Sequence, residues 1–211
     1  MLFLSLQKPV TAMLLHDKLA GIRLILASHS PRRRQLIEGT GLSFTLADTY
    51  ECEERYPATM PAGDVAAYLS ELKSRAYPQP LADNEILVTA DTTVVVGDRV
   101  LGKPADRDDA TAMLRLMSGR EHTVITGVTL RSARATRTFK SETSVRFREM
   151  TDEEIAYYVD NFRPYDKAGA YGIQEWIGYV AIERIEGSFY NVMGLPVQKL
   201  YTELNEFTEL Q

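Results

Sequence analysis

The junction between an apolar run and a basic helix start, at residues 24–38, constrains this chain most. Residues 24–27 are continuously apolar, which is typical of a short buried strand. Ser30 is a good helix N-cap and Pro31 suits the first helical position, so a helix is predicted to begin there. Its first turn holds three arginines, at 32–34, where the helix dipole disfavours cations. Either bound anions offset these charges or the arginines form a solvated basic patch.

The composition is that of an ordinary globular protein, with 45% hydrophobic and 25% charged residues among 211. A chain of this length can bury a core as one large domain or as one domain with two lobes. Its net charge of −5 argues against broad nucleic-acid binding, so any phosphate site must be a local concentration of cations. No apolar run approaches the ~20 residues of a membrane span. We therefore expect neither a nucleic-acid nor a membrane partner.

The single cysteine, Cys52, excludes an internal disulfide framework and favours the reducing cytoplasm as the location. Glu51 and Glu53 flank it and disfavour a catalytic thiolate. Residues 1–20 have no signal-peptide core and no evident chemistry, so we expect a loosely attached N-terminal extension, with Met13 as an alternative start. Residues 21–211 are then predicted to form a single domain.

The remaining chain predicts strands and helices that do not alternate strictly. Apolar or alternating segments predict strands, and three-to-four-residue spacing behind polar caps predicts helices. The expected strands cover 24–27, 86–90, 94–100, 122–130, 136–148, 178–184 and 188–193, and the expected helices begin at Ser30, Asp64, Asp106, Thr151 and Gly194. The fold class is therefore α/β, with a mixed central sheet flanked by helices rather than a regular doubly wound sheet.

Several features carry candidate chemistry. Asp91 is expected at the C-terminal end of an inner strand, where open α/β sheets place reactive groups. The acidic segment 48–63 is expected to be a surface loop, either solvated or holding a divalent metal. Lys73 lies beside the apolar stripe of its helix, as a snorkelling side chain or a ligand. Residues 166–174 mix glycines with charge, which suits backbone close to a ligand, whereas His122 is interpreted as structural. These residues alone predict an α/β enzyme that binds a phosphorylated metabolite.

A series of short motifs follows in a fixed order. It consists of Ser28-x-Ser30-Pro31-Arg32-Arg33, Glu54, Lys73, Ala90-Asp91-Thr92, Gly102-Lys103-Pro104, Ser118-Gly119, Thr126-Gly127-Val128, the segment 166–174 and Gly194-Leu195-Pro196. This series resembles that of the Maf family of nucleoside triphosphate pyrophosphatases, over nearly the whole chain. The resemblance implies a fold similar to that of the inosine-triphosphate pyrophosphatases, an elongated sheet in two lobes with a central cleft. It also implies a divalent metal, Mg²⁺ or Mn²⁺, and cleavage of the substrate to nucleoside monophosphate and pyrophosphate.

The resemblance further implies roles for single residues. Asp91 would be the base that accepts a proton from water. Glu54 would be the metal-linked carboxylate, with Glu53 as the alternative. Leu72 departs from the pattern, because many relatives carry glutamate there, and this argues against a metal role at that position. The triphosphate would be held by Ser28, Arg32, Arg33, Lys73 and Lys103.

Arg32, Thr92 and Gln174 resemble the branch of the family that acts on dTTP and UTP, so Thr92 and Gln174 are counted with the substrate-binding residues. A glutamine amide offers both a donor and an acceptor to the O4/N3 edge of a pyrimidine. The resemblance thus implies hydrolysis of dTTP and UTP, with modified uridine triphosphates as further candidates, in a house-cleaning role. The alternatives are a 7-methyl-GTP pyrophosphatase and a non-catalytic regulator of septum formation. A homodimer is left open.

Overall fold

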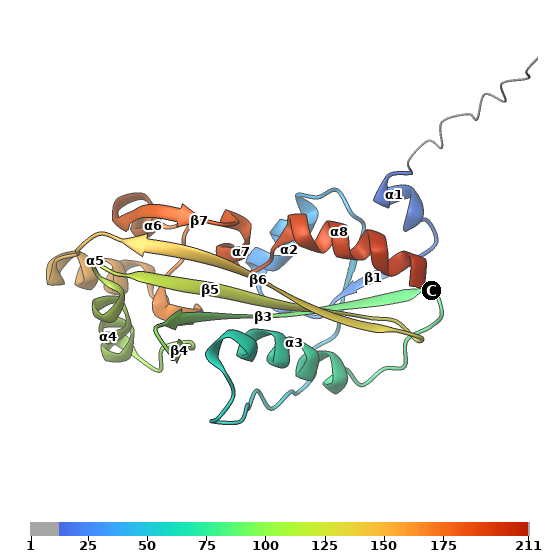
Figure 1. Ribbon diagram of the computed structural model, residues 1–211, viewed down its shortest axis with the longest axis horizontal. Coiled ribbons are helices and arrows are strands. Elements are labelled where there is room, and N and C mark those ends of the chain that lie inside the picture. Colours follow the sequence, from blue (N-terminus) through green and yellow to red (C-terminus); the bar gives the residue numbers. More distant parts are fainter. Residues whose placement is uncertain (1–12, 211) are drawn as a thin grey trace, which may run out of the picture.

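The computed structural model describes residues 13–210, which form one mixed seven-stranded sheet with helices on both sides (Figure 1). The strand order is β2-β1-β3-β5-β6-β7, and β4 pairs with β3. The strands are β1 (Arg23–Leu26), β2 (Thr45–Leu46), β3 (Glu85–Val96), β4 (Arg99–Leu101), β5 (Glu121–Arg131), β6 (Thr136–Phe147) and β7 (Ile182–Glu186). β1 pairs in parallel with β2 and β3, and the other pairs are antiparallel. The predicted mixed α/β class is confirmed.

Helices cover both faces of the sheet. α3 lies against one side of the long strands, and α2 and α8 lie on the other side (Figure 1). The α-helices of the described residues are α1 (Leu15–Lys18), α2 (Pro31–Glu38), α3 (Val65–Ala76), α4 (Arg107–Met117), α5 (Asp152–Phe162), α6 (Trp176–Ala181), α7 (Phe189–Met193) and α8 (Val197–Phe207). The 3-10 turns are η1 (Ala62–Asp64), η2 (Ala168–Ala170) and η3 (Thr208–Leu210).

Two large apolar clusters share β3, and a third, small one joins α3 to the sheet through Ala66, Val95 and Ile125. One cluster joins β1, α2 and α8 to the first half of the strand, through Ile86 and Val88. The other joins α4, α5 and α6 to the second half, through Val94. Each large apolar side chain buried in this way contributes about 1.5–3 kcal/mol. The two clusters correspond to the two predicted lobes, and Asp91 lies on β3 between them.

β3 is longer than predicted and carries Asp91 in its interior. The prediction of one strand ending at Asp91 and another over 94–100 is therefore wrong. Residues 92–96 are all β-branched, which favours continued strand, and the pairing with β5 runs through Asp91 without a break. The chain turns after Val96, and β4 folds back on the end of β3.

Two segments predicted as strands, 178–184 and 188–193, are helical for most of their length, and the strand prediction holds only for 182–184, at the start of β7. The buried side chains of α6, Ile177 and Ala181, are four residues apart, which is the spacing of a helix face. Ser188 caps α7 by accepting a hydrogen bond from the backbone N–H of Asn191. Short apolar segments do not distinguish a strand from a buried helix turn, and here the helical cap decides.

Three of the predicted helix starts follow their polar caps. The Ser30 hydroxyl accepts a hydrogen bond from the Arg33 N–H at 3.5 Å, Asp106 caps α4, and Thr151 opens α5 with a capping box. Asp64 does not cap α3. The turn η1 precedes that helix, and the Asp64 carboxylate instead lies 3.0 Å from the Lys140 ammonium on β6.

α3 packs closely on β5 at Gly127. A Cβ at Gly127 would lie 2.3 Å from the carbonyl oxygen of Ala66, so a larger residue would push the helix away from the sheet. The predicted close approach at this glycine is therefore confirmed. It allows Lys73, in the last turn of α3, to reach Asp91 on the neighbouring strand.

The start of the described chain is attached to the fold, contrary to the expectation of a loose extension. Leu15 is buried, and its N–H donates to the hydroxyl of Tyr201 on α8 at 3.3 Å. Lys18 pairs with Glu209 at 3.0 Å. The part of the expected extension before Met13 lies outside the described residues. Within residues 13–210, no helix is long and apolar enough to cross a bilayer.

His122 has the structural role predicted for it. Its ring packs edge-on against Phe147 and Tyr171, and its Nε2 lies 2.9 Å from the Tyr171 hydroxyl. The residue is only 2% exposed. Burial disfavours the charged imidazolium and lowers the pKa of His122 to about 4.

We expect His122→Gln to reduce the loss of stability on acidification. An unfolded histidine titrates near 6.5, so the stabilisation is complete above that pH and is lost as the pH falls toward the folded-state pKa of about 4. Between pH 7 and pH 5, urea denaturation should show the wild type losing about 2 kcal/mol more unfolding free energy than the variant. Equal losses would mean that His122 is not held neutral by the fold.

Candidate active site

A cavity of about 610 Å³ lies beside β3, where the two apolar clusters meet. It is lined by all nine residues predicted for the site, namely Ser28, Arg32, Arg33, Glu54, Lys73, Asp91, Thr92, Lys103 and Gln174. They come from the β1–α2 junction, the loop before α3, α3 itself, β3, the β4–α4 loop and the loop before α6. Motifs spread over most of the chain therefore share one cavity.

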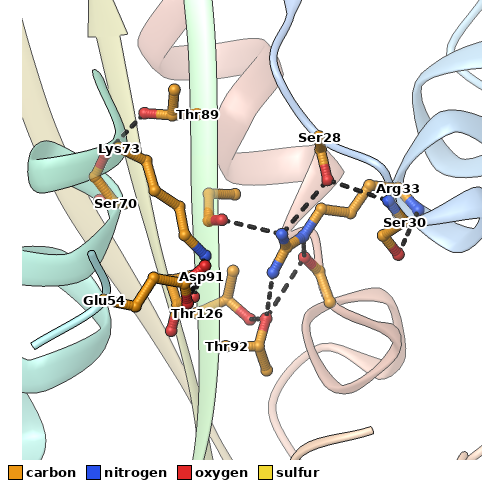
Figure 2. Close-up of polar contacts among 12 residues, drawn as sticks. Ser28, Ser30, Arg33, Glu54, Ser70, Lys73, Thr89, Asp91, Thr92 and Thr126 are labelled. Atoms are coloured by element: carbon orange, nitrogen blue, oxygen red, sulfur yellow. Dashed lines mark hydrogen bonds and ion pairs between the residues drawn. The ribbon is translucent and has the colours of Figure 1, made fainter. Parts of the chain in front are cut away.

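Lys73 lies between two carboxylates (Figure 2). Its Nζ is 2.5 Å from Oδ1 of Asp91 and 3.0 Å from Oε2 of Glu54. The Asp91 side chain is 12% exposed and that of Glu54 is 49% exposed, so only Asp91 depends on this partner for its burial. Lys73 is thus not a snorkelling side chain: it pairs with both carboxylates and neutralises one of their two negative charges, and its phosphate-binding role stays a prediction.

The two candidate metal carboxylates differ in position. Glu54 reaches Lys73 and lines the cavity, whereas Glu53 pairs with Arg55 at 2.9 Å and is 71% exposed. The geometry therefore favours Glu54. Cys52 also lines the cavity, and burial together with the Glu54 charge raises the pKa of its thiol, which agrees with the expectation that it is not a nucleophile.

Arg33 is held entirely by protein groups (Figure 2). Its Nε donates to the Gly194 carbonyl at 2.7 Å, its Nη1 to the Ala90 carbonyl at 2.8 Å, and its Nη2 to the Thr92 hydroxyl at 3.0 Å. A fourth, longer contact of 3.4 Å reaches the Ser28 hydroxyl. Burial lowers the pKa of Arg33, an effect that the nearby Asp91 charge opposes. These bonds join α2, β3 and the turn before α8, so Arg33 braces the cavity wall.

Thr92 extends the hydrogen bonds of Arg33 to the neighbouring strand β5. Its hydroxyl accepts from Arg33 and lies 2.9 Å from the hydroxyl of Thr126 on β5, which in turn donates to the Asn191 carbonyl at 3.1 Å. The Asn191 amide is buried and donates to the Val124 carbonyl at 3.0 Å. The predicted substrate-binding residue Thr92 is thus part of a hydrogen-bonded chain that fixes the cavity floor.

Arg32 points to the other lobe, unlike its neighbour. Its Nη1 lies 2.8 Å from Oδ2 of Asp166, in the loop after α5. Partial burial works against the Asp166 charge, but hydrogen bonds from Arg32 and Lys167 outweigh it and lower the pKa of that carboxyl to about 2. The predicted pairing of Lys167 with Asp166 is confirmed at 2.7 Å. A partly exposed ion pair of this kind contributes roughly 0–1 kcal/mol, so Arg32 can exchange Asp166 for another anion at little cost.

Lys103 and Gln174 complete the cavity wall. Lys103 is exposed on the loop before α4 and lines the cavity. The amide oxygen of Gln174 is buried and has no hydrogen-bond partner within the described residues. A buried acceptor left unpaired costs about 1–3 kcal/mol, so a ligand with a matching donor gains affinity there.

Two residues behind the cavity were not predicted from the sequence. Glu175 and Tyr158 hold Lys167 and the turn that carries Gln174 through a chain of hydrogen bonds. The apolar pattern of α5 placed Tyr158 on its inner face but gave no sign that its hydroxyl has a polar partner. Glu175 follows Gln174 directly, and only the folded turn shows that its carboxylate points back toward Lys167.

The protein groups offer few metal ligands by themselves. Within residues 13–210, no group of three or more histidine, cysteine, aspartate or glutamate side chains is arranged to hold a cation. Asp91 and Glu54 are nevertheless close enough to contact the same Lys73 ammonium. Magnesium is often bound by one or two carboxylates together with substrate phosphates, so this pair fits such a cation only when the triphosphate supplies further oxygens.

Comparison with known proteins identifies the family. The family model described as "Maf-like protein" matches residues 23–207. The chain belongs to the Maf family. The match begins at β1 and ends at the last residue of α8, so it includes every element that contributes to the cavity of this Maf protein.

Three curated relatives of this Maf protein carry the same name. A "dTTP/UTP pyrophosphatase" of Porphyromonas gingivalis is 49% identical over 195 residues, which is 92% of this chain and 98% of the relative. One of Parabacteroides distasonis is 48% identical over 191 residues, 90% of this chain and 99% of the relative. One of Bacteroides thetaiotaomicron is 46% identical over 184 residues, which is 87% of this chain and 95% of the relative.

Among solved structures, a HAM1 protein from Coxiella burnetii matches with a TM-score of 0.43 and 12% identity, over 88% of this chain and 99% of that chain. A "Nucleoside-triphosphatase / dITP/XTP pyrophosphatase" from Mycobacterium abscessus matches with a TM-score of 0.41 and 14% identity, over 90% of this chain and 98% of that chain. These superpositions are too loose to carry an inference.

We expect Arg33→Lys to destabilise this Maf protein and Arg32→Lys to leave its stability nearly unchanged. A lysine keeps the charge but cannot bridge three separate acceptors, so Arg33→Lys should lose two or more hydrogen bonds, about 2–3 kcal/mol. The Tm should fall by about 4–10 °C in thermal unfolding followed by circular dichroism. Equal Tm values for the two variants would show that Arg33 is not a brace.

Proposed function

We propose that this protein hydrolyses dTTP and UTP to the nucleoside monophosphate and pyrophosphate. The observation that carries the proposal is the convergence of Asp91 with Lys73, Arg32 and Lys103 in one cavity. A carboxylate beside several cations is the arrangement that hydrolysis of a polyphosphate needs, namely a base for water and positive charge for the phosphates. The names of the relatives at 44–49% identity support the choice of nucleotide.

In the proposed reaction, the oxygen of a water molecule attacks the α-phosphorus. One P–O bond forms while the bond from the α-phosphorus to the bridging oxygen breaks, and pyrophosphate leaves with that electron pair. Asp91 accepts the proton of the attacking water. Lys73 keeps the Asp91 carboxylate in place, since its Nζ contacts Oδ1 directly. Arg32 and Lys103 hold the β- and γ-phosphates, together with the backbone N–H of Arg32, because Pro31 has no N–H and the Ser30 hydroxyl accepts that of Arg33.

Asp91 and Glu54 would also hold the divalent cation, Mg²⁺ or Mn²⁺, that we infer for the reaction. Both carboxylates contact Lys73, so the three side chains leave one net negative charge that a cation can balance. Such an ion would neutralise developing charge on the phosphates and lower the pKa of the attacking water. Glu54 is the more exposed of the two and can reorient toward a cation without leaving a buried charge unpaired.

Gln174 is the residue that we propose for recognition of the base. Its buried amide oxygen lacks a partner in the described part of the chain, and the N3–H of uracil or thymine is a donor that would fill this position. The amide nitrogen can donate to O4 of the same base. Cytosine presents an acceptor at N3 and a donor at C4, so it does not match this arrangement.

We expect the purified protein to release pyrophosphate from dTTP and UTP far faster than from 7-methyl-GTP, with Mn²⁺ or Mg²⁺ present. The reason is the match between the Gln174 amide and the pyrimidine edge. A screen of pyrophosphate release across canonical and modified triphosphates measures this directly. A preference for 7-methyl-GTP would contradict the substrate, and no release from any triphosphate would favour a non-catalytic regulator.

We expect Asp91→Asn to lower kcat about 10²–10⁴-fold while UTP binding, measured by calorimetry, changes little. An amide cannot accept the proton of the attacking water, but it keeps the shape of the carboxylate. Asp98→Asn is the matched control, because Asp98 is exposed on the β3–β4 turn outside the cavity. Full turnover by Asp91→Asn would remove Asp91 as the base.

A further inference from the structure

The turn that carries Gln174 is closed by its own last residue. The Glu175 N–H donates to the Gly172 carbonyl at 3.0 Å, which closes a four-residue turn around Ile173 and Gln174. The Glu175 carboxylate then folds back: Oε1 lies 3.0 Å from the Lys167 ammonium, and Oε2 accepts a hydrogen bond from the Tyr158 hydroxyl. The Gly172 N–H in turn donates to the same hydroxyl at 3.0 Å. Both ends of the turn are thus tied to Tyr158.

These ties are buried, which makes them difficult to break. Tyr158 is fully buried, Lys167 is 8% exposed, and the Glu175 side chain is 21% exposed. Removing one partner from such a group leaves another polar atom unpaired in a low-dielectric environment. The position of Glu175 is therefore determined by α5, through Tyr158, and by the loop before η2, through Lys167.

Gly172 is required for this arrangement. A Cβ at Gly172 would lie 2.8 Å from the carboxyl carbon of Glu175 and 3.1 Å from each of its oxygens. Gly172 does not have a positive φ, so an alanine there would be strained by this contact and not by its backbone. The missing side chain provides the space that the Glu175 carboxylate occupies.

We propose that Glu175 is a positioning residue for pyrimidine recognition: it fixes the turn so that the neighbouring Gln174 amide faces the base. This inference rests on the proposed function. A glutamine side chain has three rotatable bonds, and a fixed backbone limits the positions that its amide reaches. Glu175 does not line the cavity, so its loss is expected to act on binding and selectivity rather than on the attack at phosphorus.

The test compares Glu175→Ala, Gly172→Ala and the double variant. Each single variant should raise KM for UTP and dTTP about five- to tenfold, while kcat changes less than about twofold. The ratio of kcat/KM for UTP to kcat/KM for CTP should also fall about five- to tenfold. The double variant should be no worse than Glu175→Ala, because the group that meets the new Cβ is already gone. Glu175→Gln keeps an acceptor for the Tyr158 hydroxyl, so it provides a second variant for the test if Glu175→Ala does not fold.

Two control variants change exposed side chains outside the turn, and the first matches Glu175→Gln. Glu183→Gln removes a carboxylate from the exposed edge strand β7, and Tyr157→Phe removes a hydroxyl from the residue beside Tyr158 on the exposed side of α5. Both should leave KM and the UTP-over-CTP ratio unchanged. Lower Tm values for the Glu175 and Gly172 variants with unchanged KM and ratio would overturn the inference and leave a merely structural cluster. A wild-type protein inactive on UTP and dTTP would instead overturn the proposed function, and the inference with it.

Discussion

The structure depends on one long strand that is shared by two apolar cores. The first half of β3 pairs in parallel with β1 beneath α2 and α8, and the second half packs against the helices of the other lobe. Because one continuous backbone belongs to both, the lobes are held at a fixed spacing, and the cavity between them has β3 as its floor. Asp91 lies in the middle of this strand, between the two cores, where it is buried beside Lys73 and lines the cavity.

The charges around this strand divide into those that build the cavity and those left for a ligand. Arg33 donates hydrogen bonds to Gly194, Ala90 and Thr92, and Lys73 forms ion pairs with two carboxylates. Arg32 and Lys103 are therefore the cations best able to change partner when a triphosphate enters. Removing one member of a buried ion pair is costly, about 3–5 kcal/mol, so the pair of Lys73 with Asp91 is difficult to exchange.

Much of the fold could be predicted from local signals, and the errors lie where distant pairing decides. The caps at Ser30 and Thr151 follow from a few neighbouring residues, whereas the continuation of β3 past Asp91 depends on its pairing with β5. The site residues were predicted by family resemblance, but the different tasks of Arg32 and Arg33 were not. Arg32 and Arg33 are adjacent in sequence, and only partners 134 and 161 residues away distinguish a cation that can change partner from a brace.

The central claim is that the cavity orients a pyrimidine triphosphate with its α-phosphorus at Asp91 and its base at Gln174. A crystal structure with the non-hydrolysable α,β-imido analogue of UTP and Mg²⁺ tests this most directly. The account predicts one water molecule between the Asp91 carboxylate and the α-phosphorus, in line with the bridging nitrogen, and the uracil edge on the Gln174 amide. A triphosphate bound with its α-phosphorus remote from Asp91, or with the base at the Lys73 end of the cavity, would contradict it.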